Sequence, residues 1–128
     1  MLVLIIHNKM SVVNVRVKNI RKNGYDNLRE WSQDPNNVYI GRKGVVFIEG
    51  VRYPQVSSEF CNPYKIDKDN DRNSVLKKYK KYIIERLNNE PELVEKLVDM
   101  KNKNLGCWCA PDACHGDILL SLIEKYSG

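Results

Sequence analysis

The sequence lacks the short motifs of the common nucleotide-binding and hydrolase folds. Neither GxGxxG nor GxxxxGKS/T occurs in its 128 residues, so a dinucleotide-binding fingerprint and a P-loop have no support. The GxSxG elbow of α/β-hydrolases is absent as well. A cysteine-phosphatase loop is not supported, because His115 rather than an arginine lies six residues after Cys109. No apolar run approaches the length of a membrane span.

Cysteine is scarce. The chain has four, and Cys107, Cys109 and Cys114 lie within eight positions of one another. This clustering is poor geometry for a disulfide framework and is typical of a reducing compartment. We therefore expect a cytoplasmic protein, in the host cytoplasm if the chain is viral.

The N-terminal segment lacks the features of a signal peptide. The apolar run 1–7 is short and has no basic residue before it, so we expect a strand there. Met10 offers an alternative start, which makes residues 1–9 a candidate dispensable extension. By length, the chain 1–128 is a single domain that can bury a core, and a composition of 42% hydrophobic and 29% charged residues is typical of a globular protein.

The chain has fewer acidic residues (16) than lysines and arginines (21), and the resulting net charge of +5 favours an anionic partner. The densest basic stretch is Lys77, Lys78, Lys80 and Lys81, which on a helix would straddle the outer face. We interpret this stretch as a solvated surface. Nucleic acid is therefore the weaker candidate partner, a small anionic or nucleotide-like ligand is the preferred one, and no membrane partner is expected.

The first half of the chain has the patterning of strands, in segments 12–18, 38–40, 45–48 and 51–53. The last two are separated by Glu49-Gly50, which predicts a two-residue hairpin. A short helix is expected over 27–31, ended by Asp34-Pro35. Segment 54–70 reads as a loop, and a loop that long in a small domain is usually functional or disordered.

The second half is dominated by helical spacing. Apolar residues recur at helical intervals from Val75 to Leu87, and Pro91 starts another helix at its first turn. A strand over 104–109 precedes a last helix with its apolar stripe from Ile118 to Tyr126. These elements predict the α/β class, as a Rossmann-like three-layer sandwich: a mixed sheet with helices packed on it and at least one parallel pair.

The segment from Leu105 to Asp117 is where the last strand passes into the last helix, and it holds most of the reactive side chains. A helix start leaves backbone N–H groups that attract anions. We expect Asp112 to cap this helix and Cys114, His115 and Gly116 to supply its first N–H groups. A thiol at a helix N-terminus has a lowered pKa, so an activated cysteine beside an anion site is expected.

Candidate site residues follow from this turn and from two earlier segments. The catalytic candidates are His115 as acid or base, Cys109 or Cys114 as nucleophile or polar contact, and Asp117. The ligand-binding candidates are Gly41, Arg42, Asn62, Pro111 and Gly116. Arg42 would bring a guanidinium to a phosphate, and Asn62 would orient the ligand from the long loop.

Two other interpretations of the turn remain open. Cys107, Cys109, Cys114 and His115 equal the number of ligands in a closed zinc site, although their spacing is not a common zinc pattern. Cys61 could replace one of them. A purely structural role is the other interpretation, with Cys107 packed in the core and His115 and Asp117 acting as caps. Trp31 and Trp108 are assigned to the core.

Four blocks of the sequence carry a family resemblance. They are Tyr39-Ile-Gly-Arg42, the segment Ser58 to Tyr64 ending in Asn-Pro-Tyr, a helix with Tyr79 and Tyr82, and Gly106-Cys-Trp-Cys-Ala-Pro-x-x-Cys-His-Gly-Asp117. In this order they resemble domain of unknown function 4326, an uncharacterised family of phages, large DNA viruses and some bacteria. The resemblance covers roughly Val12 to Glu124. It implies a compact α/β fold and a viral or mobile-element setting, and it implies no activity.

Together these observations predict a small α/β protein that binds a nucleotide-like or phosphorylated ligand at the Cys-His turn. The turn follows the carboxyl end of a strand, where open α/β sheets bind ligands. Transfer or hydrolysis of a nucleotide or nucleoside is the preferred activity, without a cofactor. The alternative is a zinc-stapled module that binds nucleic acid or protein without catalysis, and a third is a scaffold whose turn only packs and caps.

Overall fold

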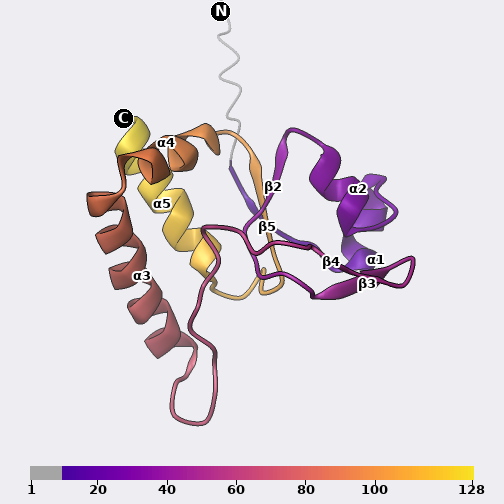
Figure 1. The fold of residues 1–128 in the computed structure, drawn as a ribbon, viewed down its shortest axis with the longest axis horizontal. Helices are drawn as coiled ribbons and strands as arrows, with labels where there is room; N and C mark the ends of the chain where they lie inside the picture. Colours follow the sequence, from indigo (N-terminus) through magenta and orange to yellow (C-terminus); the bar gives the residue numbers. More distant parts are fainter. Residues whose placement is uncertain (1–9) are drawn as a thin grey trace, which may run out of the picture.

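The computed structural model describes residues 10–128, so the strand expected over 1–7 and the extension over 1–9 lie outside the described residues. In chain order the elements are β1 (Val12–Asn14), α1 (Val17–Ile20), the 3-10 turn η1 (Arg21–Asn23), α2 (Leu28–Gln33), β2 (Asn37–Tyr39), β3 (Val46–Ile48), β4 (Val51–Tyr53), α3 (Arg72–Asn89), α4 (Pro91–Asp99), β5 (Asn104–Cys107) and α5 (His115–Ser127). The domain is of the α/β class (Figure 1). Within the described part of the chain, no helix combines the length and the apolar character that a membrane crossing needs.

The strands form two separate sheets. One has the order β1-β5-β2, and β5 pairs in parallel with both neighbours, so that Leu105 lies opposite both Val12 and Val38. The other is the expected hairpin, with β3 antiparallel to β4. Parallel pairing is therefore confirmed. The prediction of a single mixed sheet is wrong, because within residues 10–128 β3 and β4 pair only with each other.

Two strands are shorter than their sequence patterns predict. The strand expected over 12–18 ends at Asn14, and Val17 lies instead on α1 with 44% of its surface exposed. The Asn14 side chain accepts a hydrogen bond from the Arg16 N–H and donates one to the Ala110 carbonyl at 2.8 Å, which turns the chain away from the sheet. The last strand likewise ends at Cys107 rather than at residue 109.

Apolar side chains pack on both faces of the parallel sheet. Leu105 and Cys107 belong to one buried cluster, together with side chains of α3, α4 and α5. Val15 and Trp31 belong to a second cluster with residues of α1, α2 and β3. In Figure 1, α3, α4 and α5 lie on one side of the strands, and α1, α2 and the hairpin lie on the other. Trp31 is only 2% exposed, which confirms its assignment to the core.

Gly106 lets the central strand approach α2 closely. A Cβ atom at Gly106 would lie 2.7 Å from the Cζ3 atom of Trp31 and from Val15 Cγ1, closer than real contacts allow. Both neighbours are buried and have no space to move into. We therefore expect Gly106→Ala to lower the free energy of unfolding by about 2–3 kcal/mol.

Urea denaturation measures this cost, and Gly24→Ala is the matched control. A Cβ at Gly24 meets nothing within 4 Å, but its φ of 93° favours glycine, so about 1 kcal/mol is expected there. Equal losses in the two variants would show that the contact with Trp31 is not what demands glycine at position 106.

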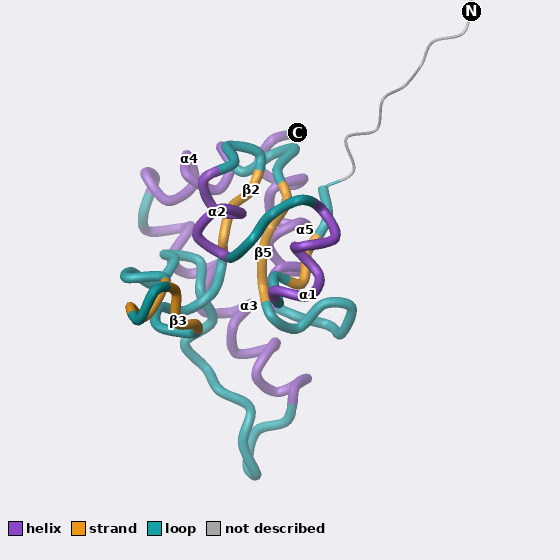
Figure 2. The backbone as a smooth tube through the Cα atoms, turned by 90° about the vertical axis from the view of Figure 1, so that its right-hand side faces the viewer, coloured by secondary structure: helices purple, strands orange, loops and turns teal. Residues whose placement is uncertain are grey.

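The long helix α3 follows the loop over residues 54–70. α3 begins after Asp71, whose side chain accepts a hydrogen bond from the Ser74 N–H at 2.8 Å. The four lysines expected on its outer face, Lys77, Lys78, Lys80 and Lys81, are all exposed. The preceding segment 54–70 has no helix or strand, as expected, and it extends well away from the sheet before returning to α3 (Figure 2).

Candidate functional site

A cavity of about 420 Å³ opens at the carboxyl ends of β2 and β5. Its walls come from the segment after β2, the long loop, the first turn of α3 and the Cys-His turn. They are formed by Gly41, Arg42, Val45, Asn62, Tyr64, Lys65, Ile66, Arg72, Val75, Leu76, Cys107, Trp108, Cys109, Ala113, Cys114 and His115. The cavity lies at the edge of the sheet where the sequence predicts a site, and its size suits a small molecule.

Arg42 joins the end of β2 to the long loop. Its Nε and Nη2 atoms donate to the Asn62 carbonyl at 3.0 and 2.6 Å, and Nη2 also donates to the Tyr64 carbonyl at 3.0 Å. The Asn62 side-chain oxygen accepts from the Tyr64 N–H at 2.9 Å, and Asn62 lines the cavity. Arg42 thus brings a guanidinium group to the cavity wall.

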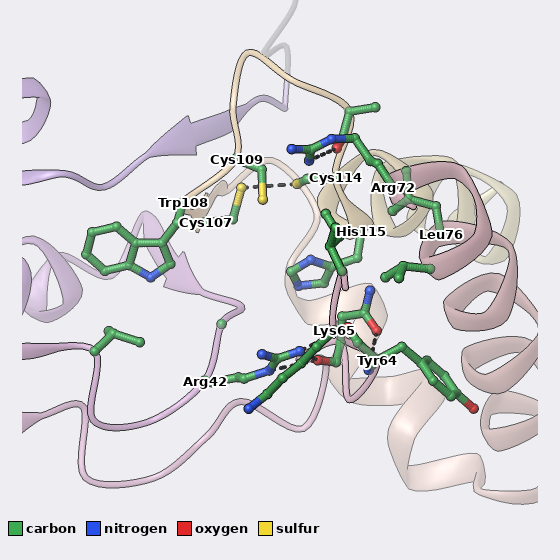
Figure 3. A pocket seen from close by; sticks show the side chains of 16 residues that line it. Arg42, Tyr64, Lys65, Arg72, Leu76, Cys107, Trp108, Cys109, Cys114 and His115 are labelled. Carbon is green, nitrogen blue, oxygen red and sulfur yellow. Dashed lines mark hydrogen bonds between the residues drawn. The ribbon is translucent and has the colours of Figure 1, made fainter. Parts of the chain in front are cut away.

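Two further cations line the cavity. Arg72, in the first turn of α3, donates from Nη1 to the Ala113 carbonyl at 2.8 Å and so links α3 to the Cys-His turn. Lys65 is exposed on the long loop. In Figure 3, Arg42 and Lys65 lie on one side of His115, and Arg72 lies on the other. An anion entering the cavity would thus meet positive charge from two directions.

The turn that starts α5 is closed by a capping box, and its cap is Cys114 rather than Asp112. Cys114 Sγ accepts from the Gly116 N–H at 3.2 Å, and Asp117 Oδ2 accepts from the Cys114 N–H at 3.0 Å. The Asp117 N–H bonds to the Cys114 carbonyl. Because the turn satisfies these groups internally, the expected cradle of free N–H groups is not formed there, and anion binding falls to the side chains.

His115 is held in one orientation and one tautomer. Its Nε2 lies 2.8 Å from the Ile40 carbonyl, and a carbonyl only accepts, so Nε2 carries the proton. Nδ1 has no hydrogen-bond partner in residues 10–128. In this range the only fully buried side-chain nitrogen or oxygen without a partner is Ser32 Oγ, so Nδ1 keeps contact with solvent. Since the residue lines the cavity, we infer that this contact is made there.

The surroundings of His115 favour a neutral ring. Burial lowers its pKa below the ordinary value of 6.5, and the nearby charge of Arg42 lowers it further, against the opposing effects of the Ile40 carbonyl and Asp117. The ring also packs edge-on against Tyr79, with 5.1 Å between centroids. His115 therefore presents an unprotonated Nδ1, the state that a proton acceptor requires.

The lowered pKa of His115 predicts a loss of stability in mild acid. The unfolded chain takes up a proton near pH 6.5 that the folded chain refuses, so stability present above this pH is lost as the pH falls through it. Between about pH 6.5 and 5.5, the Tm of the wild type should fall more than that of His115→Gln. Calorimetric melts check this, and parallel curves for the two proteins would contradict it.

Two thiols meet between the sheet and α5. The Sγ atoms of Cys107 and Cys114 lie 3.0 Å apart, and both residues are buried. The S–H···S bond to Cys114, with N–H groups of Cys109 and Ala110, lowers the pKa of Cys107 to about 7 against the effect of burial. The same bond, with burial, raises the pKa of Cys114. The first proton of this thiol pair is therefore lost readily, and the second is retained to much higher pH.

The four candidate zinc ligands are not arranged as a metal site in this geometry. In residues 10–128, no group of three or more histidine, cysteine and acidic side chains is placed to hold a metal ion. Cys107 and Cys114 are adjacent, whereas Nε2 of His115 donates to the Ile40 carbonyl, which leaves only Nδ1 of that ring as a possible ligand atom.

The cavity brings together six of the predicted site residues, namely Gly41, Arg42, Asn62, Cys109, Cys114 and His115. Pro111, Gly116 and Asp117 do not line it. Pro111 is exposed and borders a separate surface depression, and Asp117 is exposed in the capping box. A Cβ at Gly116 would lie 2.8 Å from Val12 Cγ2, so this glycine serves the packing of α5 on the sheet.

Among the wall residues that sequence reasoning missed are Lys65, Arg72 and Trp108. Trp108 packs against a buried cluster, in line with its assignment to the core, but it is half-buried and its Nε1 donates to the Tyr39 hydroxyl at 2.9 Å. That hydroxyl donates in turn to the Arg42 carbonyl at 2.8 Å. The strand ends two residues before the predicted position, and this frees the indole to reach the cavity.

Fold and site define a small α/β domain with a cationic cavity at the carboxyl edge of a parallel sheet. The chain belongs to the family described as domain of unknown function (DUF4326), whose sequence model matches residues 24–125. This confirms the family suggested by the sequence blocks. No curated protein and no solved structure matches the chain.

Proposed function

We propose that the protein binds a nucleotide-like or otherwise phosphorylated ligand in this cavity and catalyses its transfer or hydrolysis. The observation that carries the proposal is the convergence of three cations, Arg42, Lys65 and Arg72, on a ligand-sized cavity that also contains His115. Helices on both faces of a parallel sheet support a Rossmann-like three-layer arrangement, in which the carboxyl edge is the usual place for such ligands.

The walls suit a ligand with one anionic and one flat apolar part. Guanidinium groups match the geometry of phosphate oxygens, and Lys65 adds a mobile charge at the rim. The walls also contain apolar side chains, including those of Ile66, Leu76 and Trp108. A nucleobase placed against the indole would bury apolar surface while its phosphate stays near Arg42 and Arg72.

His115 would supply the chemistry. With Nε2–H held by the Ile40 carbonyl, Nδ1 can take a proton from a water molecule or a ligand hydroxyl. The deprotonated oxygen would attack the phosphorus of the ligand, the bond from phosphorus to the leaving oxygen would break, and the leaving oxygen would take a proton from water. Cys109, half-buried at the wall, and Cys114 remain candidates for polar contact with the ligand. The cytoplasmic location and the viral setting stay predictions.

Calorimetric titration tests the binding step. Nucleoside mono-, di- and triphosphates are titrated at low salt, with uncharged nucleosides and inorganic phosphate as controls. We expect at least one nucleotide to bind, with an affinity that falls as salt rises because charge is exchanged at the guanidinium groups. If the whole panel and a set of phosphosugars gave neither heat nor a thermal shift, the proposal would be wrong.

A further inference from the structure

The contact between Cys107 and Cys114 is unusual in its distance and its position. The two sulfur atoms are 3.0 Å apart, whereas non-bonded heavy atoms usually pack at about 3.5–4.0 Å. A disulfide bond is about 2.05 Å long, so the sulfurs need to approach by only about 1 Å to form one. The two residues come from the end of β5 and the cap of α5.

Backbone N–H groups favour the thiolate form of both cysteines. The Gly116 N–H donates to Cys114 Sγ at 3.2 Å, and the backbone N–H groups of Cys109 and Ala110 help to lower the pKa of Cys107. Such donors stabilise a thiolate, which is the reactive form of cysteine. A purely packing role would not need sulfur to accept N–H groups on both sides of the contact.

Small reagents can reach the pair from the cavity. Cys107 and Cys114 are 2% and 3% exposed, but both belong to the wall of the cavity. Figure 3 shows them joined across the space above His115, with Cys109 close to Cys107. This geometry favours a small oxidant such as hydrogen peroxide over a bulky disulfide reagent.

We propose that Cys107 and Cys114 are a redox site, which peroxide converts to a disulfide that joins the end of β5 to the start of α5. The Cys107 thiolate attacks a peroxide oxygen, the O–O bond breaks, and hydroxide leaves, which gives a sulfenic acid. Cys114 sulfur then attacks the Cys107 sulfur, the S–O bond breaks, and water leaves with the Cys114 proton. In total, two thiols and one peroxide give one disulfide and two waters.

Differential alkylation after peroxide treatment of the full chain tests this site. Free thiols are blocked with one reagent, the protein is reduced, and the released thiols are labelled with a second. Trypsin leaves Cys107, Cys109 and Cys114 in one peptide, because no lysine or arginine lies between Lys103 and Lys125. Cleavage before Asp112 separates Cys114 from the other two.

We expect the second label on Cys107 and Cys114, and the first label on Cys61 and Cys109. The same pattern should appear in Cys61→Ala and Cys109→Ala, and a thiol reductant should reverse it. In Cys114→Ser, which keeps a capping oxygen, the second label should vanish from Cys107 or move to a pair with Cys109. Free thiols at both positions in the wild type, or a wild-type disulfide through Cys109, would overturn the proposal.

Thermal melts give a second measurement that does not depend on labelling. The disulfide closes a short loop and constrains the unfolded chain, so the oxidised protein should melt about 5–10 °C higher than the reduced one. Cys114→Ser should show no such shift on oxidation. A wild-type Tm unchanged by oxidation would contradict the proposed link. The inference does not rest on nucleotide binding, and a failed titration leaves both of these measurements intact.

Discussion

Replacing Arg42 with alanine should weaken nucleotide binding about 100-fold, which is the largest effect on affinity expected from any single cavity residue. A charge-assisted hydrogen bond to phosphate contributes about 1.5–3 kcal/mol, or about 10- to 100-fold in Kd. Arg42 also holds the carbonyls of Asn62 and Tyr64, so its loss releases the loop that forms one wall. Titration calorimetry at fixed salt measures the change.

Two further variants separate charge from geometry. Arg29→Ala, on α2, removes the same charge from a residue that does not line the cavity, and it should leave the Kd within about two-fold. Arg42→Lys restores the charge without the planar fork, so it should recover only part of the affinity. Equal weakening by Arg29→Ala and Arg42→Ala would mean that net charge, rather than this cavity, attracts the ligand.

Most of the elements, although not α1 or η1, and the edge of the sheet where the cavity opens could be predicted from local patterns. Glu49-Gly50 between two apolar segments forms the hairpin turn, with positive φ angles of 52° and 79°. Pro91 opens α4, as its missing N–H predicts. Both signals depend on neighbours in the chain. They are therefore readable without knowledge of the tertiary fold.

Strand ends were predicted less well, because tertiary contacts set them. The alternation from Val13 to Val17 indicated one buried face, but Asn14 bonds to the distant Ala110 carbonyl and ends the strand. Asp112 had the residue type of a helix cap, yet Cys114 occupies that position with Asp117 as its partner. A thiol is a less usual cap, and nothing local in the sequence distinguishes the two choices.

The residues that line the cavity could likewise be predicted only where local sequence signals place them. Arg42 and Asn62 could be proposed from their place after a strand and in a long loop, and the structure joins them directly. Arg72 reaches the site only because α3 packs against the Cys-His turn, where its guanidinium meets the Ala113 carbonyl. Likewise, the contact between Cys107 and Cys114 follows from the fold of the turn rather than from the spacing of cysteines.

His115→Gln should lower turnover of a nucleotide substrate by about 100- to 10,000-fold, the usual contribution of a positioned acid or base. Glutamine can still donate from its amide to the Ile40 carbonyl, as Nε2 does, so the fold should be preserved. It offers no proton acceptor equivalent to Nδ1. The Kd of the nucleotide should therefore change by only a few-fold, which separates loss of catalysis from loss of binding.

The pH profile of turnover provides the decisive control on His115. Because burial lowers its pKa below 6.5, the neutral ring persists in mild acid, and the fall in kcat/KM should begin only below that pH. Residual turnover by His115→Gln should lack this acid limb. Steady-state rates across the range measure both, with an unaltered circular dichroism spectrum as evidence of folding. A glutamine variant that kept wild-type turnover would leave His115 with the structural role of anchoring α5 to Ile40.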